Sequence, residues 1–258
     1  RKGHEVTIYD AMPKMGGMLR YGIPEYRLPK SVLDKEIALI EGMGIKMLNN
    51  IKISKDVTFS HLKETYDAVR VAVGAWSSTK MGVTGEDNKQ VFGGIDFLRK
   101  VALGEEVVAG ENIAIVGGGA AGVDAIEFFA ERGARVVVIE QNSEIGYGID
   151  PITRCRLQDT LQKYGVTVHP NTVLKKVTDT AFEVERNGQR EQISFDYGYL
   201  CMGMQSDAPL MKQLNEVFPP NGVEVLNIGD SRSARRMIDG IREGRNILTV
   251  LERLSYFQ

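Results

Sequence analysis

The residues with the clearest chemical meaning form a short glycine-rich run between residues 117 and 122. Gly117, Gly119 and Gly122 fill the three glycine positions of the spacing GxGxxG. In this spacing the first glycine permits a tight turn, the second admits a pyrophosphate close to the backbone, and the third lets a helix pack closely on a strand. The N–H groups at the helix start then face the phosphates. The run therefore predicts a dinucleotide site made by Gly117, Gly118, Gly119, Ala120, Ala121 and Gly122.

The segments on either side of this run are those that such a site needs. Residues 113–116 are an apolar run typical of a strand that is buried on both faces. Residues 120–132 have helical spacing, and residues 135–139 form a second β-branched strand that ends at Glu140. A GxGxxG spacing alone is weak evidence, but its register with a strand, a helix and a second strand is specific. A later strand, residues 197–202, ends at Gly203, which we assign to the same site.

Glu140 bears on the choice of nicotinamide cofactor. It lies 23 residues after Gly117, where an acidic side chain can accept hydrogen bonds from the adenosine ribose. A carboxylate there would also repel a 2′-phosphate. We therefore expect NAD(H) rather than NADP(H). Arg154 and Arg156 are the residues that could fold back and reverse this preference.

The bulk composition limits the classes of function. The 258 residues are 43% hydrophobic and 26% charged, with a net charge of −2, which gives no general reason to expect nucleic acid or an anionic membrane as partner. No apolar run approaches the roughly 20 residues of a membrane span, so we expect a cytoplasmic location. Cys155 and Cys201 belong to no CxxC pair, which disfavours a disulfide-reductase mechanism. We predict no metal site and no acid–base catalytic residue.

The rest of the chain alternates between helical and strand patterns. Residues 1–10 read as the second strand of a Rossmann unit ending at an acid, Asp10, so we expect its first strand and glycine turn to be missing. Prolines and glycines in residues 12–29 exclude a regular element there. The other expected helices are 30–42, 60–65, 95–103, 153–164 and 233–254, and the other expected strands are 45–48, 67–73, 166–169, 172–177, 181–186, 190–195 and 223–228.

Together these segments resemble the flavoproteins with two dinucleotide-binding domains, the pyridine nucleotide oxidoreductases. GGMLRYGIPEYRLPK resembles the small chain of glutamate synthase and its relatives, and NIGDSRSARRMIDGIREG resembles the C-terminal part of iron–sulfur flavoenzymes. The resemblance implies an α/β fold with two Rossmann-like, three-layer domains, in which an NAD(P) domain interrupts an FAD domain. The matching layout is residues 1–105 for the first part of the FAD domain, 106–206 for NAD(P), and 207–258 for the return.

The resemblance also implies which residues would contact FAD. Asp10 stands where the family binds the adenosine ribose, and Asp230 stands in the GD motif that binds the ribityl chain. The further cofactor-binding residues are Gly16, Gly17, Arg20, Gly74, Gly229 and Met237. The FAD GxGxxG and the cysteine-rich region of several relatives are not in this sequence, which puts FAD binding by this chain in doubt.

Residues and resemblance together predict an NAD(P)H-dependent flavoprotein oxidoreductase. It would pass hydride from NAD(P)H to FAD and feed a partner subunit or domain that carries an Fe–S or flavin centre. One alternative is a self-contained flavin reductase of a small organic substrate such as a quinone or enoate. Another is a non-catalytic nucleotide-binding module.

Overall fold

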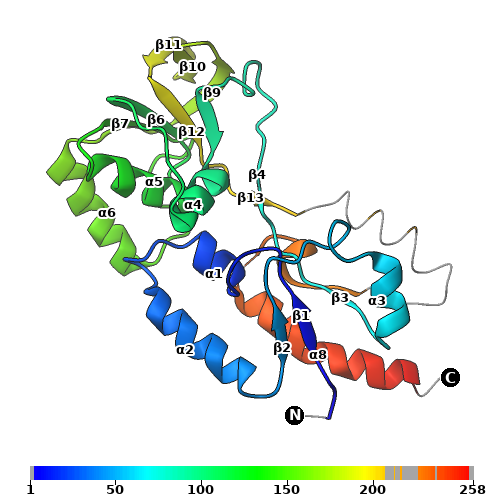
Figure 1. Ribbon diagram of the computed structural model, residues 1–258. Coiled ribbons are helices and arrows are strands. Elements are labelled where there is room, and N and C mark those ends of the chain that lie inside the picture. The colour runs from blue at the N-terminus through cyan, green and yellow to red at the C-terminus, as the bar shows by residue number, and fades with distance from the viewer. Residues whose placement is uncertain (1–2, 207–211, 213–215, 217–225, 236, 256–258) are drawn as a thin grey trace. The chain divides into compact units, whose positions relative to one another are not determined.

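A computed structural model describes residues 3–206, 212, 216, 226–235 and 237–255 (Figure 1). The chain divides into two compact units that alternate along the sequence. Unit 1 comprises Arg1–Arg20, Glu25–Trp76 and Gln205–Gln258, and unit 2 comprises Tyr21–Pro24 and Ser77–Met204. The predicted assignment of FAD and NAD(P) to domains bounded at residues 105 and 206 stays a prediction.

Unit 2 is built on a five-stranded sheet whose strands are all parallel. In spatial order the strands are β5 (Val91–Gly93), β12 (Tyr197–Leu200), β6 (Asn112–Val116), β7 (Arg135–Ile139) and β8 (Thr167–His169). From β6 the chain steps outward to β7 and β8, and later returns to β12 on the other side of β6. This order makes unit 2 a Rossmann-like α/β domain, which confirms the predicted α/β class, whereas the predicted insertion of one Rossmann-like domain in another stays a prediction.

The sheet of unit 2 is the middle of three layers (Figure 1). One face packs against α4 (Gly94–Leu103), α5 (Ala120–Ala130) and α6 (Pro151–Tyr164), and the other packs against an antiparallel meander of β9 (Thr172–Val177), β10 (Ala181–Arg186) and β11 (Gln189–Ser194). In β6, Ile113 and Ile115 face the helices, whereas Ala114 and Val116 face the meander. Because both faces are covered, the strand is apolar at every one of these positions.

Tyr199 on β12 joins the aromatic cluster under the helices. Its ring centroid lies 5.1 Å from that of Phe97 and 4.7 Å from that of Phe129, and its hydroxyl donates to the carbonyl oxygen of Val108 at 2.6 Å. We expect Tyr199→Phe to keep the packing but lose the hydrogen bond, at about 1 kcal/mol of unfolding free energy. Thermal unfolding should show a midpoint lower by about 2–4 °C. The same change at Tyr147, which is 80% exposed, should leave the midpoint unchanged; equal midpoints for both variants would contradict this reading.

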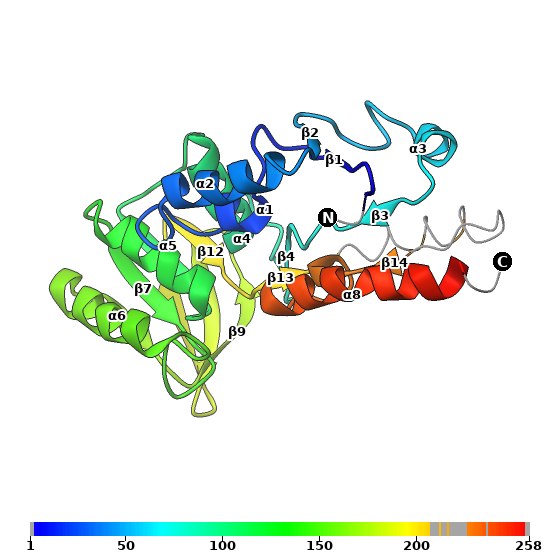
Figure 2. The same ribbon diagram turned by 90° about the horizontal axis from the view of Figure 1, so that it is seen from below.

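Unit 1 contains short parallel strand pairs with helices. β1 (Thr7–Tyr9) pairs with β2 (Lys46–Leu48), and β3 (Arg70–Val71) pairs with β14 (Leu226–Asn227). Figures 1 and 2 both show β1 beside β2. The helices are α1 (Gly17–Tyr21), α2 (Lys30–Glu41), α3 (Phe59–Thr65), the 3₁₀ turn η2 (Gly229–Ser231) and α8 (Met237–Ser255). A further short sheet, which belongs to unit 2 except for Gln205, joins β4 (Ser77–Ser78) and β13 (Met204–Gln205).

Several segments differ from the sequence prediction. Residues 12–29 contain the one-turn helix α1, so the expectation of no regular element there was wrong. β5 was not predicted, because a three-residue edge strand inside a polar connector has no alternation to detect. The last helix begins at Met237 rather than Ser233. Of the strand predicted at 223–228, residues 226–227 are β14, and residues 223–225 lie outside the described residues.

Candidate functional site

The candidate site lies at the carboxyl ends of β6 and β12 in unit 2. From β6 the chain runs outward to β7 and β8 on one side, and it later returns to β12 on the other side of β6. The carboxyl ends of β6 and β12 therefore form the switch point at which α/β sheets bind ligands. Gly117 follows β6, and Gly203 follows β12. Cys201 donates its N–H to the carbonyl of Val116 at 2.8 Å, which holds the two strand ends together. The fold therefore brings the predicted residues of unit 2 together at the carboxyl ends of the parallel strands.

The glycine loop, residues 117–122, has backbone geometry that a side chain would disrupt. Gly117 has a φ of +96°, which favours glycine, and a Cβ added there would lie 2.7 Å from the carbonyl oxygen of Cys201. At Gly122 an added Cβ would lie 1.9 Å from the carbonyl oxygen of Gly117. The first position thus makes the turn, and the third permits α5 to approach β6.

Gly119 differs from the other two motif glycines. It is the N-cap of α5, it supplies no side-chain cap, and nothing lies within 4 Å of an added Cβ. The first N–H groups of a helix have no partner within the helix, so an uncapped start offers them to an anion. The residues of this loop therefore fit a pyrophosphate.

Glu140 is turned into the protein. Its residue is 5% exposed, and one carboxylate oxygen accepts from the N–H of Gly118 at 2.7 Å. The other accepts from the backbone N–H and the side-chain amide of Asn142, both at 2.8 Å. Glu140 thus braces the glycine loop against the turn after β7.

Sequence reasoning missed the segment after β7 that covers this loop. Gly146 donates its N–H to the carbonyl of Gly118 at 2.9 Å, and Ile145 lies so close to Gly118 that an added Cβ would meet its Cγ1 at 2.3 Å. Gly146 has a φ of +83°. The sequence signal that could have revealed this segment was the pair of glycines at 146 and 148, because glycines at such spacing indicate a turn rather than the start of a helix.

Cys201 lies beneath the glycine loop as a packing residue. Its thiol would be 2.7 Å from a Cβ added at Gly94, and burial raises the pKa of the Cys201 thiol to about 12. It is therefore protonated and apolar at neutral pH. Cys155 on α6 is exposed, and both cysteines are free thiols.

In unit 1, the predicted residues near the N-terminus lie around the turn after β1. Asp10 follows β1 and accepts from the N–H of Met12 at 2.9 Å. Gly16 and Gly17 have φ values of +127° and +51°. Arg20 is 7% exposed, donates from Nε to the carbonyl of Met15 at 2.6 Å, and pairs with Asp34. This pairing lowers the pKa of the Asp34 carboxyl. Arg20 therefore ties the loop to α2.

The remaining residues predicted to bind FAD follow β3 and β14. Gly74 and Gly229 have φ values of +75° and +64°. Asp230 accepts from the N–H of Arg235 at 3.1 Å, and Met237, at the start of α8, is 57% exposed. Sequence reasoning missed Glu243, which accepts from the N–H of Gly229 at 2.7 Å and from the Arg235 guanidinium at 2.5 Å. These contacts hold the GD turn against α8.

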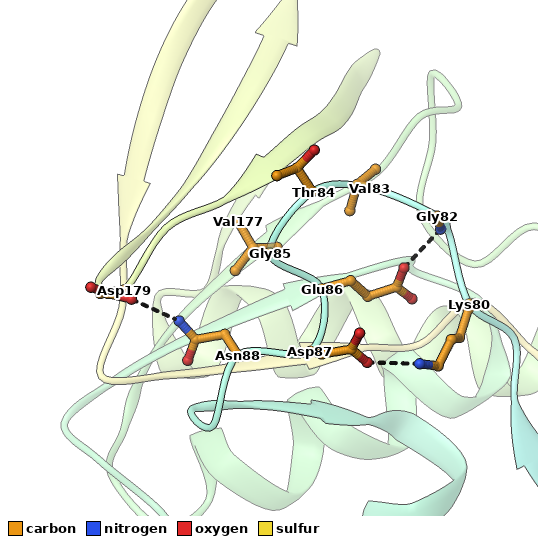
Figure 3. A pocket seen from close by; sticks show the side chains of 10 residues that line it. All are labelled: Lys80, Gly82, Val83, Thr84, Gly85, Glu86, Asp87, Asn88, Val177 and Asp179. Atoms are coloured by element: carbon orange, nitrogen blue, oxygen red, sulfur yellow. Dashed lines mark hydrogen bonds and ion pairs between the residues drawn. The ribbon is translucent and has the colours of Figure 1, made fainter.

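A surface pocket of about 650 Å³ opens elsewhere in unit 2 (Figure 3). Its polar groups are already paired within the protein: Lys80 with Asp87 at 2.7 Å, and Glu86 with the N–H of Gly82 at 2.7 Å. The side-chain amide of Asn88 donates to the carbonyl of Thr178 at 3.1 Å. These bonds fasten the connector before β5 to the β9–β10 turn. The pocket is separate from the glycine loop, and its lining is Lys80, Gly82, Val83, Thr84, Gly85, Glu86, Asp87, Asn88, Val177 and Asp179.

Two features are absent from the described part of the chain. Among the described residues, histidine, cysteine, aspartate and glutamate side chains form no cluster of three or more that could hold a metal ion. The helices that the structure describes include none with the length and apolar character to cross a membrane.

Comparison with known proteins places these features among oxidoreductases. The family model for pyridine nucleotide-disulphide oxidoreductases matches residues 1–226. The chain is similar to the NADPH-Fe(3+) oxidoreductase subunit beta of Geobacter sulfurreducens, at 39% identity over 138 residues, and to the NADP(+)-dependent formate dehydrogenase subunit beta of Moorella thermoacetica, at 41% over 139 residues. It is also similar to the glutamate synthase [NADPH] small chain of Escherichia coli, at 30% over 148 residues.

These alignments are partial on both sides. They cover 52%, 53% and 53% of this chain, and 20%, 20% and 31% of the three relatives. The fold is similar to that of a 2-naphthoyl-CoA reductase, with a TM-score of 0.79 and 24% identity over 94% of this chain and 36% of that one. The resemblance to the glutamate synthase small chain that the sequence suggested is confirmed.

The expected preference for NAD(H) over NADP(H) was wrong. The three relatives are named for NADPH or NADP(+). The physical reason lies in Glu140. The prediction assumed a free carboxylate facing the ribose, whereas both carboxylate oxygens accept hydrogen bonds from Gly118 and Asn142. Glu140 therefore braces the loop, and its carboxylate is not the free group facing the ribose that the prediction assumed.

Proposed function

Because the chain belongs to the pyridine nucleotide-disulphide oxidoreductase family, we propose that it is part of an NADPH-dependent flavoprotein that passes electrons to a partner centre. The observation that carries this proposal is the glycine loop at the switch point of unit 2, with its uncapped helix start at Gly119. NADPH would lie with its pyrophosphate over residues 117–122. Gly203, at the end of the neighbouring strand, would border the same dinucleotide.

Unit 1 would bind FAD. Asp10, Gly16, Gly17, Gly74 and the Gly229–Asp230 turn would hold the flavin dinucleotide, with Met237 and Arg20 nearby. Positive φ at these glycines supports this, because such turns let the backbone approach a ligand closely. A flavin held by these residues would supply the capacity to take up hydride and to release electrons singly or in pairs. The chain's own residues then bind and orient, and no side chain needs to move a proton.

The partner is proposed to carry an Fe–S or flavin centre. Two of the similar proteins are named as beta subunits, one of an Fe(3+) oxidoreductase and one of a formate dehydrogenase, which supports a multi-subunit setting. No pair of cysteines in CxxC spacing is present in the sequence to act as the acceptor.

The test is anaerobic mixing of the full-length protein with NADPH, followed in the flavin absorption band. We expect NADPH to reduce the flavin on the time scale of one catalytic turnover. The flavin should be reoxidised only when a partner subunit or an artificial one-electron acceptor such as ferricyanide is added. Reoxidation by a quinone or enoate alone would favour a self-contained flavin reductase. Absence of flavin from the full-length protein would overturn the proposal and leave a nucleotide-binding module.

A further inference from the structure

An exposed ion pair lies in the segments next to the glycine loop. Arg154 is in the first turn of α6, and Glu144 is in the segment after β7. The Arg154 guanidinium meets the Glu144 carboxylate at 2.8 Å. The two side chains are 43% and 72% exposed. An exposed pair of this kind contributes little to stability, so the fold does not need it.

Arg154 lies close to the segment that covers the glycine loop. Gly146 donates to the carbonyl of Gly118, and a Cβ added at Gly146 would lie 3.8 Å from both Cγ and Nε of Arg154. The arginine stem thus lies against a residue that is hydrogen-bonded to the predicted pyrophosphate loop. The amino end of α6 is capped by Asp150, which accepts from the N–H groups of Ile152 and Thr153. A ligand would therefore meet the guanidinium rather than the helix end.

The other arginines of this region are committed elsewhere. Arg156 pairs with Glu127 on α5, whose side chain is 8% exposed. Removing Arg156 would leave a buried carboxylate, so its role is structural. Arg135 is the first residue of β7 and therefore lies at the amino end of the strand, whereas the glycine loop lies at the carboxyl ends. It pairs with Glu111 at 3.5 Å.

We propose that Arg154 binds the 2′-phosphate of NADPH and that Glu144 weakens this binding by competing for the same guanidinium. This inference rests on the proposed function. A phosphate monoester carries a charge of about −1.5 to −2 and offers three acceptor oxygens, so it outcompetes a single exposed carboxylate for an arginine fork. Glu144 stays nearby as a like charge to the phosphate. The pair therefore sets how strongly the site prefers a 2′-phosphorylated dinucleotide.

The test compares 2′,5′-ADP with 5′-AMP, two ligands that differ only in the 2′-phosphate, by isothermal titration calorimetry on the full chain. We expect wild-type protein to bind 2′,5′-ADP more tightly. Arg154→Ala should weaken 2′,5′-ADP by about 10- to 100-fold and leave 5′-AMP unchanged, since it removes one charge-assisted contact. Glu144→Gln should tighten 2′,5′-ADP severalfold without affecting 5′-AMP.

The matched control is Arg154→Lys, which keeps the charge but not the fork, and should lose only part of the preference. If wild-type protein binds neither ligand, the proposed function and this inference both fail. If it binds both and Arg154→Ala keeps the full preference for 2′,5′-ADP, this inference is overturned while the proposed function stands. An unchanged affinity for 2′,5′-ADP in Glu144→Gln would overturn the competitive role of Glu144.

Discussion

Replacement of Gly122 by alanine is expected to weaken NADPH binding strongly and to destabilise unit 2. The added Cβ would lie 1.9 Å from the carbonyl oxygen of Gly117. Both groups belong to the backbone, so no side-chain rotation relieves the contact, and α5 must move away from β6. Overpacking usually costs 1–3 kcal/mol, and we expect a loss at the upper end, about 3 kcal/mol. This movement takes the N–H groups of the loop away from the proposed pyrophosphate position, and we expect it to weaken NADPH by about 100-fold, or about 2.8 kcal/mol.

The matched control is Gly119→Ala, three residues away on the same loop. Gly119 has a φ of −74°, and nothing lies within 4 Å of its added Cβ. Gly119→Ala should therefore lower the thermal midpoint much less than Gly122→Ala does, by only the cost of alanine in place of glycine at an N-cap. Its methyl group would occupy the proposed pyrophosphate position and weaken NADPH. Thermal unfolding and calorimetric titration separate the two effects. Wild-type stability in Gly122→Ala, or wild-type NADPH affinity in Gly119→Ala, would contradict the assigned roles.

The elements of unit 2 that are buried on both faces were predictable from sequence. Residues 113–116 and 135–139 are apolar or β-branched almost throughout, because helices cover one face and the meander covers the other. The observed strands match these predictions within one residue. The turn at Asn187-Gly188 was predictable as well, since both residues adopt the positive φ that this dipeptide favours in hairpins.

Short elements held by distant partners were not predictable. β5 exists because Val91–Gly93 aligns with Gly198–Leu200, more than 100 residues later in the chain. α1 forms in a segment rich in proline and glycine, where Arg20 bonds to the carbonyl of Met15 and to Asp34 on α2. A propensity argument sees neither contact, because each depends on tertiary structure.

In the candidate site, the direction of the Glu140 side chain was likewise not predictable from the sequence. The spacing placed Glu140 at the end of β7, and the structure has it there. The sequence could not say where the carboxylate points, because its partners are a backbone N–H at Gly118 and the amide of Asn142. The names of the relatives overturned the expected preference for NAD(H), and the direction of this carboxylate gives the physical reason.

Glu140→Gln is the variant that tests this corrected role. Glutamine keeps one acceptor oxygen but presents an NH₂ group either to the N–H of Gly118 or to the donors of Asn142. One charge-assisted hydrogen bond is lost in a buried position, at about 1.5–3 kcal/mol. Because the loop serves any dinucleotide, NADPH and NADH should weaken alike, each by about 10- to 100-fold.

Calorimetric titration of both dinucleotides measures the ratio of their affinities, which should stay at its wild-type value in Glu140→Gln. Asn142→Ala provides the matched control, because it removes only the side-chain donor and leaves the backbone N–H to Glu140 in place. It should weaken both dinucleotides by less than Glu140→Gln does. A selective loss of NADH in Glu140→Gln would mean that the carboxylate leaves the loop to bond the ribose when a dinucleotide is present. If the ratio of NADPH to NADH affinity instead changes on substitution of Arg154 and not of Glu140, the discrimination lies on α6. Glu140 would then serve only to brace the loop.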